Sequence, residues 1–454
     1  MTNIQTVSGN DADTSSTASG SIAENAVYRK ITLRLVPLLF LAYLLAFLDR
    51  INVGYAKLQM SADLGFSEAV YGLGAGIFFI SYLLFEVPSN LWLERIGVRI
   101  TLLRIMVLWG LVSASTMLVQ TPEQFYFVRL LLGICEAGFF PGIILYLTYW
   151  FPSSRRGKVT GQFMFAIPVA GIIGGPLSGW IMSSMDGVSG LHGWQWMFLI
   201  EGLPTVLLGC LCYVLLANRP SEAKWLSASE KQVVITAMER DADPSVSNGH
   251  VGALSKMRLA LSDYRVWLLA FIYFTTACAN YTFTFWLPTI IKGLGVTSVS
   301  HIGMYSAIPY VFAALGVLFV SASSDKRKER RWHVGGSLIL GAIGLATTPF
   351  LNNSLMATLL VLSFVGFFQF GAGIAYWAIP STYLNKATAA VGIGLVSSIG
   401  VIGGFVSPAL LGFIKDLTGS LDNGIFTIAL LMLAGGLAIL VALPARAVRV
   451  GTEP

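Results

Sequence analysis

Apolar stretches of about twenty residues or more recur twelve times between Ile31 and residue 444. An α-helix of ~20 residues rises ~30 Å, which is the thickness of the hydrocarbon core of a bilayer. A chain crosses that core only if its backbone hydrogen bonds are closed internally, as they are in a helix. The pattern therefore predicts an all-α membrane protein with twelve spanning helices. The expected spans are residues 31–54, 68–92, 101–120, 124–150, 159–183, 194–217, 264–290, 299–322, 333–351, 354–382, 389–414 and 422–444.

The composition excludes a water-soluble enzyme. Charged residues make up 11% of the 454 residues and hydrophobic residues 55%, whereas a soluble domain carries about 25% charged residues. The four cysteines lie in apolar runs without CxxC spacing, and the four histidines lie near predicted loops or helix ends. Neither residue type forms a metal-ligand pattern. We therefore expect no enzymatic reaction and no metal.

The lysines and arginines fall on one side of the predicted spans. If the N-terminus is cytoplasmic, all but five of the 29 Lys and Arg residues lie in cytoplasmic segments. Positive charge marks the cytoplasmic side of membrane proteins, so we expect both termini in the cytoplasm. The same bias accounts for most of the formal net charge of +6 without a nucleic-acid partner. The five exceptions are Arg50, Lys57, Arg129, Lys292 and Lys415.

One long connection, residues 218–263, divides the twelve spans into two sets of six and is rich in Glu, Lys, Asp and Ser. The glycine-rich segment 174–176 in span five is echoed by 403–408 in span eleven, which supports an internal repeat. Duplicated six-helix halves with a site between them are a recurring transporter plan. We expect a disordered cytoplasmic tail (1–27), an N-terminal six-helix bundle (28–217), a cytoplasmic central loop (218–263), a C-terminal six-helix bundle (264–445) and a cytoplasmic tail (446–454).

Two acids and two bases lie within the spans of the N-terminal half. Asp49 and Arg50 are in span one, and Arg129 and Glu136 are two helical turns apart on one face of span four. A charge at the bilayer centre costs about 2.5–3.5 kcal/mol, so these residues need partners, water or a function. A guanidinium binds a carboxylate through paired hydrogen bonds, and a buried carboxyl group can carry a proton. The set suits capture of an organic anion together with a proton.

A structural role is the alternative for these four charges. They can clamp helices together as ion pairs, and the two in span one can reach the outer membrane interface. For two further acids we favour the structural role. Glu86 is close to the cytoplasmic end of span two, and Glu201 lies in a helix-bending stretch.

The C-terminal half offers polar and aromatic groups in place of charges. Such side chains can line a cavity and bind hydroxyl groups or a ring, although aromatic residues in spanning helices also pack or face lipid. Tyr82 in span two is a candidate of the same kind. The candidates in the C-terminal half are Asn280, Tyr281, Gln369, Tyr376, Trp377, Ser397 and Ser398.

Five stretches of the chain carry a family resemblance. They are FLDRINVGYAKLQM (47–60), FEVPSNLWLERIGVR (85–99), RLLLGICEAGFFPGIILYLTYWFP (129–152), GWQWMFLIEGLP (193–204) and NRPSEAKWLSASEK (218–231). With these motifs the chain resembles, from about residue 28 to 444, the major facilitator superfamily. Within it the chain looks most like the anion:cation symporter branch, and there like tartrate, phthalate and hydroxyphenylacetate permease-like members. The resemblance implies two pseudo-symmetric six-helix bundles.

The resemblance also implies roles for the charges of spans one and four. Asp49 and Glu136 would carry the proton, and Arg50 and Arg129 would bind or gate the anion. The implied function is proton-coupled import of a small organic anion by alternating access, in the bacterial inner membrane. The proton gradient would drive it, no other cofactor is implied, and the functional unit would be the monomer.

Other positions match the family less evenly. Tyr82 and Trp377 match site-lining positions, whereas Ser397 stands where galactonate-type members have an Asn. Asn90 and Glu94 stand where the superfamily pattern has Gly and Asp. Aromatic residues would suit a ring and paired arginines would suit a hydroxy-dicarboxylate, so a tartrate-like hydroxy acid, a sugar acid and an aromatic carboxylate all stay open.

A proton-coupled exporter of an amphipathic or anionic compound is the competing class. Gly171, Gly175, Pro176 and Gly179 in span five fit a pattern that resembles drug:proton antiporters. The same glycines can instead serve close helix packing, the interpretation we favour because similar clustering recurs in span eleven. A receptor that does not transport lacks support, since the central loop and both tails are short.

Overall fold

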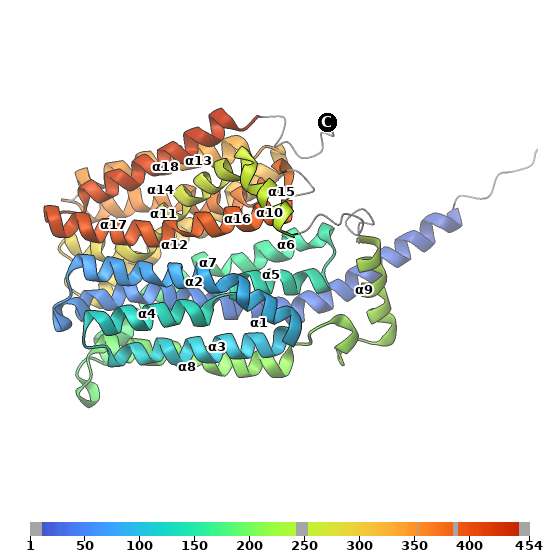
Figure 1. Cartoon of the computed structure of the whole chain (residues 1–454), viewed down its shortest axis with the longest axis horizontal. Helices are drawn as coiled ribbons and strands as arrows, with labels where there is room; N and C mark the ends of the chain where they lie inside the picture. The colour runs from blue at the N-terminus through green and yellow to red at the C-terminus, as the bar shows by residue number, and fades with distance from the viewer. Residues whose placement is uncertain (1–10, 242–252, 352, 385–388, 445–454) are drawn as a thin grey trace, which may run out of the picture.

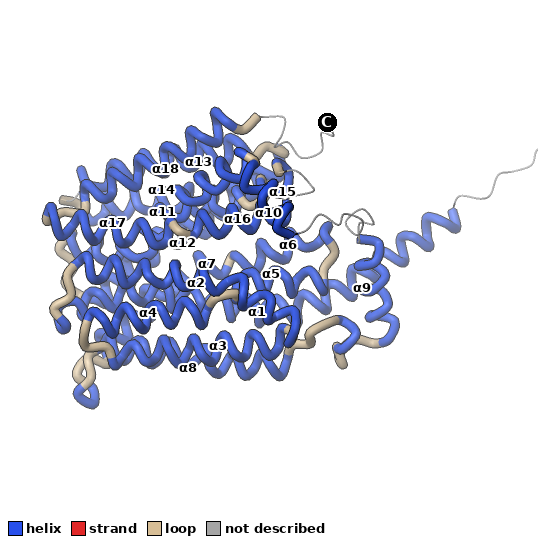
Figure 2. The backbone as a smooth tube through the Cα atoms, viewed as in Figure 1, coloured by secondary structure: helices blue, strands red, loops and turns tan. Residues whose placement is uncertain are grey.

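The computed structural model describes residues 11–241, 253–351, 353–384 and 389–444. Within these ranges the regular structure is entirely helical (Figure 2). The N-terminal bundle contains α1 (Asp11–Leu64), α2 (Glu68–Ile96), α3 (Val98–Ser115), α4 (Pro122–Glu136), α5 (Phe139–Trp150), α6 (Ser153–Met164), α7 (Ala166–Ser184) and α8 (Gly193–Leu215). The C-terminal bundle contains α11 (Tyr264–Gly293), α12 (Val299–Arg327), α13 (Arg331–Thr347), α14 (Leu355–Tyr376), α15 (Pro380–Tyr383), α16 (Ala389–Val401), α17 (Gly403–Thr418) and α18 (Asp422–Ala442).

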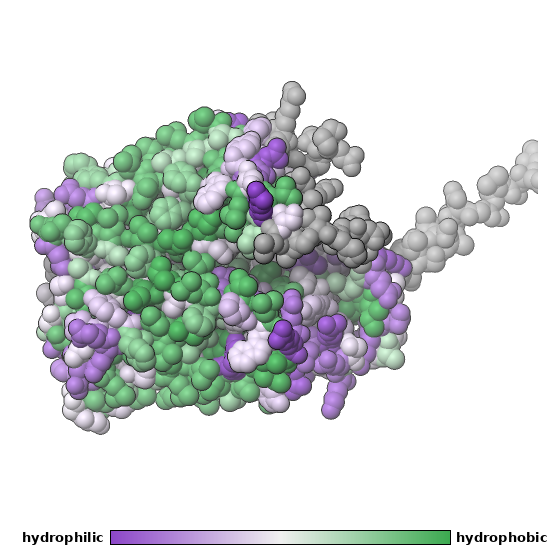
Figure 3. Space-filling view, viewed as in Figure 1, coloured by the Kyte–Doolittle hydropathy of each residue, from purple (hydrophilic) through white to green (hydrophobic). Residues whose placement is uncertain are grey.

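Twelve helical segments of the described chain are long and apolar enough to cross a membrane, which confirms the predicted number of spans. The two bundles lie side by side in Figure 1, one built from α1 to α8 and the other from α11 to α18. Hydrophobic residues cover much of the visible face between the two ends, where hydrophilic residues gather (Figure 3). An apolar surface of this extent fits contact with lipid rather than water.

Three of the membrane-crossing segments in the described chain each join two α-helices. Span four breaks between α4 and α5, span five between α6 and α7 at Phe165, and span eleven between α16 and α17 at Ile402. Only the first break contains a left-handed residue, Gly138 with φ 86°. A side chain there would also lie 2.5 Å from Ser89 Oγ on α2, so both conformation and space require glycine.

The segments expected to be tail and loop contain helices. Residues 11–27, expected to be disordered, form the start of α1, whereas residues 1–10 and 445–454 lie outside the described chain. The central segment contains α9 (Ala228–Asp241) and α10 (Ala253–Ser262). Lys30 Nζ lies 2.8 Å from Glu230 Oε2, and Asp241 accepts a 2.8 Å hydrogen bond from the backbone N–H of Ser153, which holds α9 against the N-terminal bundle.

The bundles approach each other closely at glycines. A side chain at Gly175 of α7 would lie 2.5 Å from the carbonyl oxygen of Gly303 on α12. A side chain at Gly72 of α2 would lie 2.2 Å from the carbonyl oxygen of Pro408 on α17. Small residues therefore set the contact between bundles, as they do between spanning helices generally. This supports helix packing as the reason for the glycines of span five.

A polar cluster joins the bundles at the end of the molecule where α1 ends and α2 begins, which we call the far end; the opposite end carries α9 (Figure 1). Glu68 forms ion pairs with Lys57 of its own bundle and with Lys415 of the other, the latter at 2.7 Å. Asp416 accepts hydrogen bonds from the backbone N–H groups of Glu68 and Ala69 at 3.0 and 2.8 Å. These contacts hold the far end closed between the bundles.

Candidate functional site

A cavity lies between the two bundles, and the empty space among its lining atoms, open solvent included, is roughly 970 Å³. It receives residues from α1, α2 and α5 to α7 on one side and from α11, α14 and α16 on the other. Aromatic side chains dominate its wall: Tyr43, Phe47, Phe79, Tyr82, Phe140, Tyr273, Tyr281, Phe370 and Trp377. The polar and charged residues of the wall are Arg50, Glu86, Thr276, Asn280, Gln369 and Ser397.

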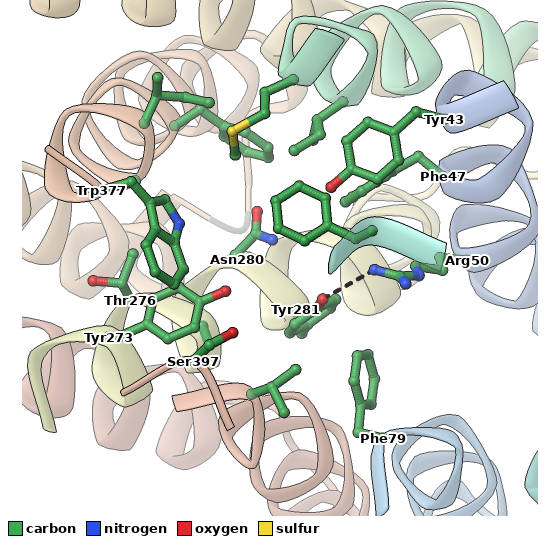
Figure 4. Close-up of a pocket in the computed structure, with 18 of the residues that line it drawn as sticks. Tyr43, Phe47, Arg50, Phe79, Tyr273, Thr276, Asn280, Tyr281, Trp377 and Ser397 are labelled. Atoms are coloured by element: carbon green, nitrogen blue, oxygen red, sulfur yellow. Dashed lines mark hydrogen bonds between the residues drawn. The ribbon is translucent and has the colours of Figure 1, made fainter. Parts of the chain in front are cut away.

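Arg50 is the cation of this wall and reaches groups from both bundles. Its Nε donates to Glu136 Oε1 at 3.1 Å, and its Nη2 makes an ion pair with the same oxygen. Its Nη1 donates to the hydroxyl of Tyr281 at 3.4 Å (Figure 4). The guanidinium carbon also lies 5.1 and 5.6 Å from the ring centroids of Phe47 and Tyr82, within cation–π range. Arg50 therefore connects α1, α4 and α11 at the cavity.

Glu136 owes its position to the break in span four. It is the last residue of α4, and the chain turns through Ala137 and Gly138 before α5 begins. Its side chain is fully buried. One carboxylate oxygen is taken by Arg50, while Oε2 is buried without a hydrogen-bond partner among the described residues. A carboxylate with one free oxygen beside a cavity is well placed to accept a proton.

Arg129 does not reach the cavity. It is 1% exposed, and its guanidinium donates to the carbonyl oxygens of Gly74 and Ala75 on α2 at 3.2 and 3.3 Å. The sequence placed Arg129 and Glu136 on one face, but the ion-pair partner of Glu136 is Arg50. Arg129 therefore ties α4 to α2 in this conformation, and its expected role in anion binding gains no support from its position.

Asp49 is likewise inside the N-terminal bundle and away from the cavity wall. It accepts hydrogen bonds from Ser113 at 2.7 Å, from Asn52 at 3.1 Å and from the indole N–H of Trp109. Asp49 and Arg50 are 2% and 8% exposed, so neither reaches outward to a membrane interface. All three hydrogen-bond donors to Asp49 are neutral. The role of Asp49 as a proton carrier stays a prediction.

The remaining candidates divide into lining and packing residues. Substrate binding by these candidates stays a prediction, and Ser398 is not among the residues that line the cavity. Tyr82, Asn280, Tyr281, Gln369, Trp377 and Ser397 line it. Tyr376 does not: its hydroxyl donates to the carbonyl oxygen of Leu269 at 2.7 Å, and its ring packs parallel to that of Tyr273.

Sequence reasoning missed several lining residues. Tyr273 and Thr276 share one face of α11 with Asn280, since they follow the three- and four-residue spacing of a helix, and this signal could have found them. Glu86 lines the cavity one turn from Tyr82, although it was expected to be structural. In the described part of the chain, no group of three or more His, Cys, Asp or Glu side chains could hold a metal ion.

Relatives of this chain are transporters by name. A protein of Pseudomonas putida, provisionally named the metabolite transport protein NicT, is 44% identical over 93% of this chain and 95% of its own. A protein of Agrobacterium vitis, provisionally named a tartrate transporter, is 44% identical over 92% of this chain and 95% of its own. A quinolone resistance transporter of Acinetobacter baumannii is 41% identical over 91% of this chain and 94% of its own.

The fold has solved counterparts. The crystal structure of a D-xylose–proton symporter superposes with a TM-score of 0.70 at 16% identity, covering 91% of this chain and 98% of that one. The family model of the Major Facilitator Superfamily matches residues 39–408. The protein is therefore a multi-pass membrane transporter, not an enzyme, and it belongs to the major facilitator superfamily.

Proposed function

We propose that this protein is a proton-coupled symporter that imports a small organic anion by alternating access. The observation that carries the proposal is Arg50, a guanidinium at the cavity wall whose charge is balanced by Glu136 from another helix. A guanidinium in this position matches the carboxylate of a substrate in charge and in geometry.

Charge balance couples the anion to a proton. When Arg50 binds a substrate carboxylate, it loosens its contact with Glu136, and a buried carboxylate without a partner is costly. A proton on Glu136 removes that cost. The free Oε2 of Glu136 gives the proton an acceptor that Arg50 does not occupy. The neutral assembly of anion, Arg50 and protonated Glu136 can then reorient between the two sides of the membrane.

We place the α9 end in the cytoplasm of a bacterium, because the lysines and arginines gather at that end. The polar cluster around Glu68 then closes the periplasmic side, and the cavity belongs to an inward-facing state. Alternating access requires this cluster to open while the α9 end closes. Each chain holds both bundles and the cavity between them, which supports function as a monomer.

The test is the external pH of lightly buffered, de-energised proteoliposomes. Addition of a transported anion outside should make the medium more alkaline, because protons enter with it. Glu201 provides a matched control for Glu136. It is a buried carboxylate of the same bundle that accepts a 2.7 Å hydrogen bond from Ser178 and lies away from the cavity wall. Glu201→Gln should retain the alkalinisation. Anion uptake without a pH change would contradict the proposed symport.

Export in exchange for protons is the second candidate function. The observation that favours it is the 41% identity to a quinolone resistance transporter. The same proteoliposomes separate the two candidates, since an exchanger acidifies the medium when its substrate is added outside. The single cavity guanidinium favours an anionic over a cationic compound in either direction.

A further inference from the structure

We propose that the transported anion is a planar aromatic monocarboxylate with a hydrogen-bond donor on the far side of its ring. This inference rests on the proposed function and narrows its substrate class. It follows from three features of the cavity: its single cation, its aromatic walls and an unpartnered amide oxygen across from that cation.

The charges of the wall favour one carboxylate over two. Among the described residues that line the cavity, Arg50 is the only cation and Glu86 the only acid. The guanidinium of Arg129, which a second carboxylate would need, donates into the backbone of α2. A second carboxylate would therefore enter the cavity without a positive partner.

The walls favour a flat ring. The ring of Phe79 lies 4.3 Å from that of Tyr281, and the ring of Tyr273 lies 4.7 Å from that of Trp377, centroid to centroid. These pairs come from both bundles and face the interior of the cavity in Figure 4. Aromatic side chains bind a planar ring by stacking and edge contacts.

The C-terminal bundle supplies an acceptor for the other side of the ligand. Gln369 is 1% exposed, and its Nε2 donates to the carbonyl oxygen of Thr276 at 2.8 Å. Because a carbonyl can only accept, this bond fixes the orientation of the amide. Its Oε1 has no hydrogen-bond partner in the described chain although it is buried. A phenolic hydroxyl or ring N–H would satisfy that oxygen.

Figure 4 shows how these groups are arranged. Arg50 lies on one side of the cavity, Trp377 and Thr276 lie on the other, and Asn280 lies between them. A ligand that places its carboxylate at Arg50 therefore extends its ring between the aromatic walls toward the C-terminal bundle. Gln369, which lines the same cavity, would supply the acceptor for the donor on the far edge of that ring.

The experiment is a matched panel tested against the purified full-length protein, by calorimetric binding and by uptake into proteoliposomes. 4-Hydroxybenzoate is compared with benzoate to test the donor, with cyclohexanecarboxylate to test planarity and with terephthalate to test the second charge. Tartrate represents hydroxy-dicarboxylates. We expect 4-hydroxybenzoate to bind about tenfold or more tightly than tartrate, terephthalate or cyclohexanecarboxylate, and more tightly than benzoate.

Two variants link the preference to the cavity. Gln369→Met should bring 4-hydroxybenzoate down to the affinity of benzoate, and Trp377→Leu should reduce the preference for benzoate over cyclohexanecarboxylate. Trp180→Leu is the matched control, because Trp180 is 59% exposed on the outer surface of the bundle. It should leave every preference in place.

The outcomes separate the two proposals. If tartrate or terephthalate binds most tightly and enters with protons, the symport proposal holds and the aromatic assignment is overturned. If aromatic monocarboxylates bind most tightly but enter without protons, the aromatic assignment holds and symport is overturned. Equal affinity across the panel would also overturn the aromatic assignment.

Discussion

The two bundles share a fold but differ in where they place charge. Among the described residues, every buried charged side chain belongs to the N-terminal bundle: Asp49, Arg50, Lys57, Arg129, Glu136 and Glu201. The buried polar residues of the C-terminal bundle are neutral, for example Thr276, Ser306 and Gln369. Two bundles of the same architecture can thus serve different roles. In the proposed mechanism, the N-terminal bundle handles charge and the C-terminal bundle fits the rest of the ligand.

The charges of the N-terminal bundle are also unlike one another. Asp49 has three hydrogen-bond donors, and Glu201 has Ser178. Arg129 is held by backbone carbonyl groups. Of the buried charges in the described chain, only the pair of Arg50 and Glu136 extends from the interior of the bundle to the cavity wall. Burial of charge alone therefore does not mark the functional residues, whereas connection to the cavity does.

Arg50→Met should have the largest effect on anion uptake, because it acts on the charged side of the cavity. It removes the anion-binding group and leaves Glu136 buried without its partner, a change that costs ~3–5 kcal/mol when a buried pair is broken. Anion uptake should fall by about 100-fold or more. The double variant Arg50→Met with Glu136→Gln should recover folding, seen as a monodisperse protein in detergent, but not uptake. Near-normal uptake by Arg50→Met would contradict the assignment of charge binding to the N-terminal bundle.

Gly138→Ala should have the next largest effect. The left-handed conformation at φ 86° costs a non-glycine residue ~1–2 kcal/mol, and the methyl group would meet Ser89. The change should displace Glu136 and lower both thermal stability and uptake, the latter by about tenfold. Gly394→Ala in the C-terminal bundle is the control, because no atom lies within 4 Å of its added methyl. Equal effects of the two variants would show that the N-terminal break has no special role.

Lys415→Met should have a moderate effect on the contact between the bundles. It removes the ion pair with Glu68 at the far end, while the hydrogen bonds of Asp416 remain. Since part of this pair is exposed, the loss should be ~1 kcal/mol or less. Thr289 of α11 lies beside this cluster, because its hydroxyl accepts a 3.2 Å hydrogen bond from Lys57 Nζ. Labelling of a cysteine introduced at Thr289 should become a few-fold faster, whereas Lys415→Arg should label at the original rate. Unchanged labelling of Lys415→Met would show that the pair does not help to close this end.

The smallest effect concerns α9, which docks on the N-terminal bundle through the buried side chain of Val234 as well as through polar contacts. Hydrogen bonds from Ser153 hold the pKa of Asp241 below its usual value. The docking contribution of Asp241 is therefore present above about pH 4 and is lost as pH falls through the lowered pKa. Limited proteolysis of α9 should keep a constant rate from pH 7 to 5 and accelerate only at lower pH. Asp241→Asn should be cleaved faster already at pH 7, unlike Asp325→Asn in the other bundle.

The sequence predicted the elements of the fold more completely than the contacts of the site. Hydropathy alone located the twelve spans, because lipid imposes a helix of a given length. Their polar and aromatic character within a span also singled out Asn280 and Tyr281, which line the cavity. The partner of Glu136 could not be predicted this way, since Arg50 belongs to another helix and spacing within one helix does not report contacts between helices.

The contacts of Arg129 could not be predicted from the sequence either. Its charge and position in a span predicted an anion-binding group, but its partners are the carbonyl oxygens of Gly74 and Ala75. Backbone acceptors carry no sequence signature, so a side-chain pattern cannot reveal them. The close packing of α4 on α2, where a side chain at Gly133 would lie 2.1 Å from Ser81 Oγ, is what brings these oxygens within reach.

The central claim is that Glu136 couples the proton to the anion bound at Arg50. The most direct test compares two assays of Glu136→Gln in proteoliposomes: exchange of labelled for unlabelled anion, and accumulation of the anion driven by a pH gradient. The account predicts that exchange continues, because the neutral amide mimics the protonated acid, while accumulation and external alkalinisation disappear. Glu201→Gln should perform both. Proton-driven accumulation by Glu136→Gln at the original level would contradict the account.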